Sequence, residues 1–203
     1  MMAPVVIYDA CVLYPAPLRD LLIRVARTGI VRARWSEQIL DECFRSILDQ
    51  RPDLKPDALR RTRQLMEAAI PDCLVAGFEG LVPGLELPDP EDRHVLAAGI
   101  HAGAKLIVTA NLRDFPRAAL APYHIEARHP DEFVRQLIDL APWIVFGVLS
   151  EQAAALRNPP RELNDLMGTL HDVGLVRSVA RLRRLKALSD SRDDPGSFGR
   201  SSK

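Results

Sequence analysis

A short apolar run near the start of the chain constrains the fold more than any other feature. Residues 5–8, with the sequence VVIY, all favour β-strands, and the run stops at Asp9. A strand that is apolar at consecutive positions, rather than at alternate ones, is typical of a strand buried on both faces in a parallel sheet. We therefore expect residues 5–8 to form the central first strand, with Asp9 at its carboxyl end.

Strands and helices are expected to alternate along the first 130 residues. Residues with strong boundary preferences mark the helix ends: Gly29 follows the first helix, Ser36 precedes the second and Gly103 follows the last. The expected helices cover residues 18–28, 36–50, 57–69 and 89–103, and the later strands cover residues 30–33, 73–76, 105–109 and 123–126. This alternation predicts an α/β sandwich around a mainly parallel sheet.

The strand pattern stops after residue 130. Residues 131–186 have helical periodicity, interrupted at 158–160 and at Gly174. Residues 189–203 are polar and nearly free of apolar side chains. We expect a main domain at residues 1–130, a helical appendage packed on it at residues 131–188, and a disordered tail at residues 189–203.

Composition limits the cellular compartment and the partners that net charge can attract. The 27 basic and 27 acidic residues balance, so any nucleic-acid site must be local. Cys11, Cys43 and Cys73 are widely spaced, which favours a reduced cytoplasm over a disulfide framework or a zinc ribbon. The N-terminal segment lacks the basic region of a signal peptide, and the apolar stretch 141–149 is about half of a membrane span. We expect a cytoplasmic protein without membrane contact, in which residues 141–149 form a core helix.

Two stretches carry local positive charge despite the neutral total. They are the stretch of Arg45, Arg51, Lys55, Arg60, Arg61 and Arg63, and the stretch of Arg177, Arg181, Arg183, Arg184 and Lys186. The first could contact phosphates and the second could bind a partner, but a solvated helix face explains either stretch equally well.

Acidic residues occur where the expected fold brings chain segments together. Asp9 and residues 109–114 follow two strands, and ligands of open parallel sheets bind beyond the carboxyl ends of the strands. We expect these two segments to converge at one edge of the sheet. Glu42 falls off the apolar face of its helix, so periodicity alone predicts a solvated side chain.

Asp92 lies on the helical face that is expected to meet the sheet. It shares a stripe with Val95 and Leu96, at spacings of three and four residues. A carboxylate at the end of an apolar stripe requires a compensating partner, and a bound cation would serve. The alternative is that Asp92 completes a capping box that Asp89 begins.

Four segments resemble the PIN-domain family, in particular its bacterial VapC-like toxins, over roughly residues 4–130. They are VVIYD at 5–9, ILDE at 39–42, DPEDRHVLAA at 89–98 and LIVTANLRDFP at 106–116, of which the last two together are specific. The resemblance implies a PIN-like three-layer α/β/α sandwich, with residues 1–130 as the catalytic domain. It also implies a catalytic and metal-binding site made of Asp9, Glu42, Asp92 and Asp114, oriented by Thr109 and Asn111.

The resemblance further implies an activity and its partners. It implies hydrolysis of RNA phosphodiester bonds by a metal-activated water, performed by the toxin component of a type II toxin–antitoxin system. A cognate antitoxin protein and a homodimer are implied as well. Carboxylates clustered without convergent His or Cys favour Mg²⁺ or Mn²⁺ over zinc. Asp89 and Glu91 are left outside the ligand set, and the histidines are interpreted as core or surface residues: His94, His101, His124, His129 and His171.

Two other classes of α/β protein do not fit the sequence. A phosphoacceptor domain requires an acidic pair near the first strand and a Lys after the last strand, and no Lys fits that position. A dehalogenase-like phosphatase requires D-x-D, whereas Asp9 is followed by Ala10 and Cys11. A non-catalytic PIN-fold binding module and a housekeeping RNA-processing nuclease remain open alternatives.

Overall fold

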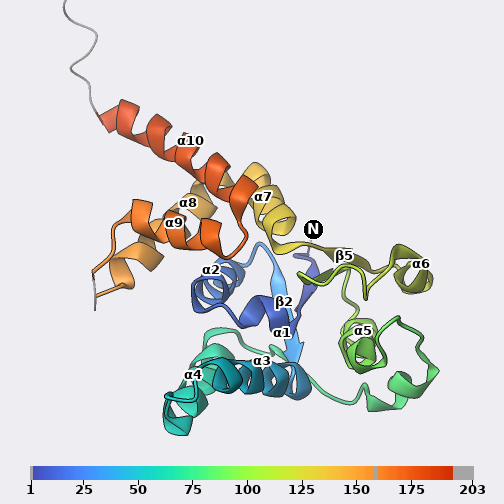
Figure 1. The fold of residues 1–203 in the computed structure, drawn as a ribbon. Coiled ribbons are helices and arrows are strands. Elements are labelled where there is room, and N and C mark those ends of the chain that lie inside the picture. Colours follow the sequence, from blue (N-terminus) through green and yellow to red (C-terminus); the bar gives the residue numbers. More distant parts are fainter. Residues whose placement is uncertain (1, 158–159, 194–203) are drawn as a thin grey trace, which may run out of the picture.

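The computed structural model describes residues 2–157 and 160–193 and contains one five-stranded sheet (Figure 1). The strands are β1 (Val5–Tyr8), β2 (Arg32–Ser36), β3 (Leu74–Val75), β4 (Leu106–Val108) and β5 (Glu126–Arg128). Their order is β3-β2-β1-β4-β5, and every pairing is parallel. The apolar run of β1 is therefore the central strand, as its sequence predicted.

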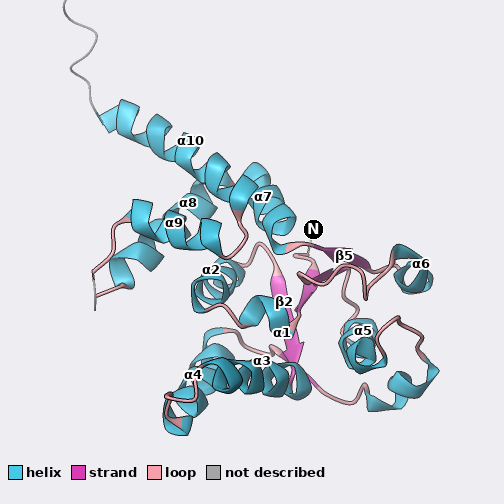
Figure 2. Ribbon diagram, viewed as in Figure 1, coloured by secondary structure: helices cyan, strands magenta, loops and turns pink. Residues whose placement is uncertain are grey.

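Helices connect the strands and cover both faces of the sheet (Figure 2). The α-helices are α1 (Ala10–Leu13), α2 (Ala16–Arg27), α3 (Glu37–Gln50), α4 (Pro56–Ala69), α5 (Arg93–His101), α6 (Arg117–Leu120), α7 (Pro130–Leu140), α8 (Pro142–Ala155), α9 (Leu163–Asp172) and α10 (Val176–Asp193). Short 3-10 helices cover Glu79–Gly84, Pro90–Asp92 and Ala121–Tyr123. Helix α3 begins at the predicted cap, where the hydroxyl of Ser36 accepts from the amide of Ile39 at 3.2 Å.

Successive residues of β1 face opposite helical layers, because side chains alternate along a strand. On one face, the Tyr8 hydroxyl donates to the Leu22 carbonyl of α2 at 3.4 Å, and the Tyr8 ring meets the edge of Phe133 of α7. On the other face, Ile7 packs against α5 at Gly99, where a Cβ would lie only 3.5 Å from Ile7 Cγ1. The fold is thus a three-layer α/β/α sandwich.

The four helices after β5 pack against one another and against α2. The buried Asp131 carboxylate of α7 accepts from the amides of Arg177 and Ser178, at 2.9 and 2.8 Å, and so caps the start of α10. The Ser178 hydroxyl also donates to the Asp131 carbonyl at 2.7 Å. Helix α8 contacts α2, where the Gln152 side-chain amide donates to the Pro17 carbonyl at 2.9 Å.

Two strands begin later than their sequence patterns predicted. The strand expected at 30–33 forms at Arg32–Ser36, after a turn in which Gly29 has a φ of 81°. The strand expected at 123–126 forms at Glu126–Arg128, because His124 adopts a left-handed φ of 57° and a strand cannot continue through it. The helix expected from residue 89 starts as a 3-10 turn and becomes α-helical only at Arg93.

The C-terminal helices also differ in detail from expectation. Helix α10 continues to Asp193, so residues 189–193 are helical and not part of the disordered tail expected from residue 189; residues 194–203 lie outside the described residues. The core helix expected at 141–149 is the start of α8, which buries Val145 and Leu149 but leaves Trp143 and Ile144 each 44% exposed. In the described part of the chain, no single helix is long and apolar enough to cross a membrane; the α7–α8 pair reaches that length only when taken together, with a 118° bend.

Candidate active site

Asp9 and the segment 109–114 lie side by side at the carboxyl edge of the sheet. Strands β1 and β4 are hydrogen-bonded neighbours in which Tyr8 lies opposite Val108. The amide of Asp9 donates to the carbonyl of Val108 at 3.2 Å. The two segments therefore leave their strands at the same level, where ligands of parallel sheets bind.

The carboxylate of Asp9 is buried and held by three donors. Its Oδ1 accepts from the amide of Ala10 at 2.7 Å. Its Oδ2 accepts from the hydroxyl of Thr109 at 2.7 Å and from the thiol of Cys11 at 3.1 Å. The Thr109 oxygen in turn accepts from the amide of Asn111 at 3.0 Å. These bonds fix the plane of the Asp9 carboxylate through the protein alone, as precise metal sites require.

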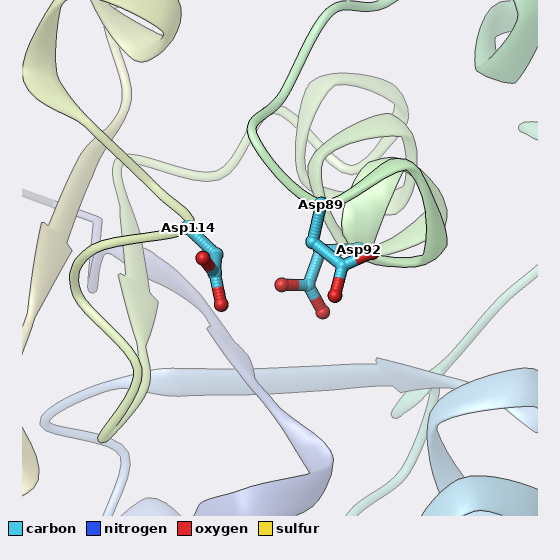
Figure 3. A group of neighbouring side chains, drawn as sticks. All are labelled: Asp89, Asp92 and Asp114. Carbon is cyan, nitrogen blue, oxygen red and sulfur yellow. The ribbon is translucent and has the colours of Figure 1, made fainter.

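Asp89, Asp92 and Asp114 point toward one another at the same edge (Figure 3). One carboxylate oxygen from each residue lies within 4.8 Å of the oxygens from the other two. Carboxylates this close cannot all be ionised at low cost unless a cation lies among them; otherwise one of them tends to keep its proton. The three residues, which we call the acidic trio, therefore form a candidate cation site.

Asp92 is the most perturbed member of the acidic trio. Burial, followed by the charges of Asp9, Asp89 and Asp114, raises the pKa of Asp92 to about 6. Its Oδ2 atom is buried, and no donor among the described residues reaches it. The capping alternative does not explain this carboxylate, because Asp89 accepts from the amide of Glu91 at 2.9 Å while Asp92 makes no capping bond. Oxygen donors with one buried oxygen left without a partner fit a divalent cation.

Asp114 is held by its own loop. The side-chain amide of Asn111 donates to Asp114 Oδ2, and the amide of Asp114 donates to the carbonyl of Asn111 at 3.2 Å. The guanidinium of Arg113 is 86% exposed and lies 3.6 Å from Asp114 Oδ1. Asn111 therefore touches both halves of the site: its backbone bonds to Thr109, and its side chain bonds to Asp114.

Glu42 faces the site from α3. A groove of about 400 Å³ is lined by Glu42 together with Asp9, Asp92 and Asn111. The Oε1 atom of Glu42 lies 2.8 Å from Nε2 of the buried His94, although the two atoms are not aligned as a hydrogen bond. The Glu42 side chain is 30% exposed, so it is not the fully solvated residue that periodicity predicted. Periodicity is uninformative here because the groove lies beside the apolar face of α3, not on it.

Three residues of the site were not identified from the sequence. Asp89, which the ligand set expected from the sequence does not include, belongs to the acidic trio. Its position one helical turn before Asp92 was the available indication. Cys11 and His94, which contact Asp9 and Glu42, carried no such indication, because neither lies at a strand end or at a metal-ligand spacing.

Three of the six residues of the first basic stretch are paired with neighbouring acids. Arg63 pairs with Glu37, Asp41 and Glu67. Ion pairs also join Arg51 to Asp53 and Arg60 to Asp57. In the second stretch, three arginines line a shallow hollow with Arg135 and Asp139: Arg177, Arg181 and Arg184. The first stretch thus offers less free positive charge to phosphates than its sequence suggested.

A cavity larger than the groove at Glu42 lies away from the acidic trio. It has a volume of about 590 Å³ and lies between α2, α4, α8 and α9. Ile23, Met66 and Leu166 contribute apolar lining, and Arg24, Arg27 and Arg161 contribute positive charge. This cavity is larger than the groove at Glu42, but Asp92, the carboxyl group with the raised pKa, lies in the smaller groove.

Comparison with known proteins gives two family matches and one relative. A PIN-domain model matches residues 5–113, and a VapC50 C-terminal domain model matches residues 130–184. The Mycobacterium tuberculosis (strain ATCC 25618 / H37Rv) protein named "Putative ribonuclease VapC50" is 39% identical over 95 residues. The match covers 47% of this chain and 56% of that protein, so the chain matches about half of its relative's length. No solved structure gives a significant match.

Proposed function

Because this chain belongs to the PIN-domain family, we propose that it is a metal-dependent endoribonuclease that hydrolyses RNA phosphodiester bonds. The observation that carries the proposal is the acidic trio, in which the buried Oδ2 of Asp92 has no donor among the described residues. The name of the M. tuberculosis relative, a ribonuclease, supports RNA as the substrate. The PIN-domain match covers residues 5–113, and the VapC50 C-terminal domain match covers residues 130–184. These two separate matches support our proposal of a catalytic domain at 1–130 and a helical appendage at 131–188.

Mg²⁺ or Mn²⁺ is the cofactor that we propose for this site. Asp92 and Asp114 would hold it together with Asp9, either directly or through water, and Asp89 is close enough to join them. A bound divalent cation supplies charge for the phosphate and lowers the pKa of water. Glu42 lines the same groove and would position the attacking water.

The remaining residues of the site act by holding these carboxylates. Thr109 fixes Asp9 through a 2.7 Å hydrogen bond, and Asn111 fixes Asp114. Fixed carboxylates lower the cost of ordering the site when the cation and the phosphate bind. We therefore propose orienting roles, rather than chemical roles, for Thr109 and Asn111.

We also propose the biological setting that the relative suggests. The chain would be the toxin component of a type II toxin–antitoxin system, homodimeric, cytoplasmic and silenced by a cognate antitoxin protein. The match of residues 130–184 to a VapC50 C-terminal domain supports a setting like that of this relative. Co-purification with a short DNA-binding protein encoded beside this chain would support the toxin assignment; free RNA processing without such a partner would favour a housekeeping nuclease.

Cleavage of single-stranded RNA by the purified chain tests the activity. We expect cleavage in Mg²⁺ or Mn²⁺, loss of cleavage in EDTA, and a loss of about 100-fold or more in Asp9→Asn, in line with the weight of electrostatic stabilisation in active sites. Asp172→Asn is the matched control, because Asp172 is an 82% exposed carboxylate on α9. Full cleavage by Asp9→Asn would overturn the site assignment. Inactivity across varied RNAs and metals would favour a non-catalytic binding module.

A further inference from the structure

The groove beside the acidic trio extends beyond the carboxylates. Besides Asn111, Ala10, Cys11 and the acidic residues, it is lined by Tyr14, Ser46 and Gln50. Glu42, Ser46 and Gln50 follow one another at four-residue spacing on α3, so they form one stripe along the helix. The stripe leads from Glu42 to a polar end of the groove, where Tyr14 faces it from the end of α1.

Tyr14 and Gln50 are held together at this polar end. The Tyr14 hydroxyl donates to Oε1 of Gln50, which joins α1 to the last turn of α3. The amide of Tyr14 donates to the carbonyl of Ala10 at 2.9 Å, so the residue is anchored on its helix. With Oε1 of Gln50 engaged, the Nε2 group of the same side chain remains as a donor. Tyr14 is half-buried, whereas Ser46 and Gln50 are exposed.

The side chains at the polar end of the groove favour one class of ligand. No Lys, Arg or His lines the groove in the part of the chain that the structure describes, so its polar end, away from the carboxylates that would hold a cation, has no positive charge to attract a phosphate. An aromatic ring beside an amide donor and a hydroxyl is the combination that proteins use for unpaired bases, which stack on the ring and hydrogen-bond through their edges. The volume of about 400 Å³, shared with the acidic residues, suits a small ligand rather than a duplex.

We infer that Tyr14, Ser46 and Gln50 form a subsite for one unpaired nucleobase, adjacent to the phosphate at the acidic trio. The inference rests on the proposed nuclease function and deepens it. Tyr14 stacks on the base, and Gln50 and Ser46 meet its edge. The subsite therefore restricts cleavage to single-stranded RNA and gives a preference at one nucleotide beside the cleaved bond.

An abasic scan tests the subsite without requiring cleavage. The full chain carrying Asp9→Asn, in EDTA, is titrated against a fluorescent 12-nucleotide single-stranded RNA, and each position in turn is replaced by an abasic residue. We expect one abasic position to weaken binding about 5- to 100-fold, the range that stacking of one base provides. Adding Tyr14→Ala should weaken binding of the intact RNA by a similar factor and remove the effect of the abasic position.

Two variants make the scan specific. Tyr123→Ala removes another partly exposed tyrosine, outside the groove, and should reproduce the parent scan. If Tyr14→Ala is less stable than its parent, as shown by a lower unfolding midpoint, Gln50→Ala replaces it in the scan. Gln50 is exposed at the end of α3, so its truncation should not disturb the fold. Gln50→Ala should reduce discrimination among the four bases at the sensitive position, and an unchanged preference would overturn the subsite.

The outcomes separate the subsite from the proposed activity. If the wild-type chain cleaves RNA in Mg²⁺ but Tyr14→Ala leaves the abasic effect intact, the subsite is wrong and the nuclease stands. If the abasic effect depends on Tyr14 but no metal supports cleavage, the subsite stands and the nuclease falls. A flat scan, as expected if this end receives a side chain of an inhibitor protein, overturns the subsite.

Discussion

Replacing Asp92 by Asn should stabilise the metal-free protein and remove its response to metal. The pKa of Asp92 rises from the ordinary 3.8 to about 6, because burial and three nearby carboxylates oppose its ionisation. For a fully buried group this rise corresponds to about 3 kcal/mol, at ~1.4 kcal/mol per pKa unit. Asp92 is only half-buried, so solvent screening reduces the expected gain in unfolding free energy to about 1 kcal/mol. The Asn amide can also donate to the carboxylates of Asp89 or Asp114.

The same perturbation fixes the direction of the pH dependence. A carboxyl group whose pKa is raised on folding binds more protons in the folded state than in the unfolded state between pH 3.8 and about 6. The stabilising contribution of Asp92 is therefore complete below pH 3.8 and is lost as the pH rises through about 6. The difference between wild type and Asp92→Asn in EDTA should accordingly be larger at pH 7.5 than at pH 5.

Thermal unfolding in EDTA and in excess Mg²⁺ or Mn²⁺ measures both effects. For a chain of this length, 1 kcal/mol shifts the melting temperature by about 2–4 °C. In EDTA the variant should melt above the wild type. In metal at about 100 times its Kd the wild type should gain about 2.7 kcal/mol and overtake the variant. Asp172→Asn is the control with an exposed carboxylate. A variant that is less stable in EDTA, or that gains as much from metal as the wild type, would refute the reasoning.

Three further outcomes test other parts of the structure. Asp131→Ala removes the acceptor of the Arg177 and Ser178 amides and should cost about 2–3 kcal/mol in urea unfolding; equal stability would contradict the capping role. Gly99→Ala should raise the free energy of unfolding by about 0.5–1 kcal/mol, and the melting temperature with it, because Ala favours the helix. The added Cβ meets Ile125 Cδ1 at 3.4 Å, which is an ordinary contact. A lower melting temperature would show that the contact is too tight. Burial and Asp9 raise the pKa of Cys11 to about 12, so the native thiol should react with a disulfide reagent at pH 8 far more slowly than after unfolding, and fast native reaction would contradict this environment.

The parallel sheet was predictable because its central strand is short and wholly apolar. Residues 5–8 have no polar position that could face solvent, so only a doubly covered strand suits them. Boundaries depended on local backbone geometry instead. The left-handed turn at His124 displaced the last strand by three residues. A positive φ is uncommon even for His, which adopts it more often than most residues, so the residue type alone did not predict the turn.

Only part of the site could be predicted from the sequence, and the reason is physical. Strand ends identify Asp9 and residues 109–114, because parallel pairing fixes their meeting place. Membership in the acidic trio depends on how the 3-10 turn at Pro90–Asp92 points its side chains, and this brought in Asp89. Contacts between α3 and residues after that turn, such as Glu42 with His94, join segments that no sequence period connects.

The central position of β1 has a consequence for the timing of assembly. The hydroxyl of Thr109 that orients Asp9 comes from a residue 100 positions later in the chain. At about 5–20 residues per second, synthesis needs about 5–20 s to supply it after Asp9 has been made. Until β4 docks beside β1, the carboxylates that make up the site belong to unconnected segments. If the chain cleaves RNA as proposed, a nascent chain would be inert toward RNA near the ribosome that is making it, because the order of synthesis delays activity until the sandwich is closed.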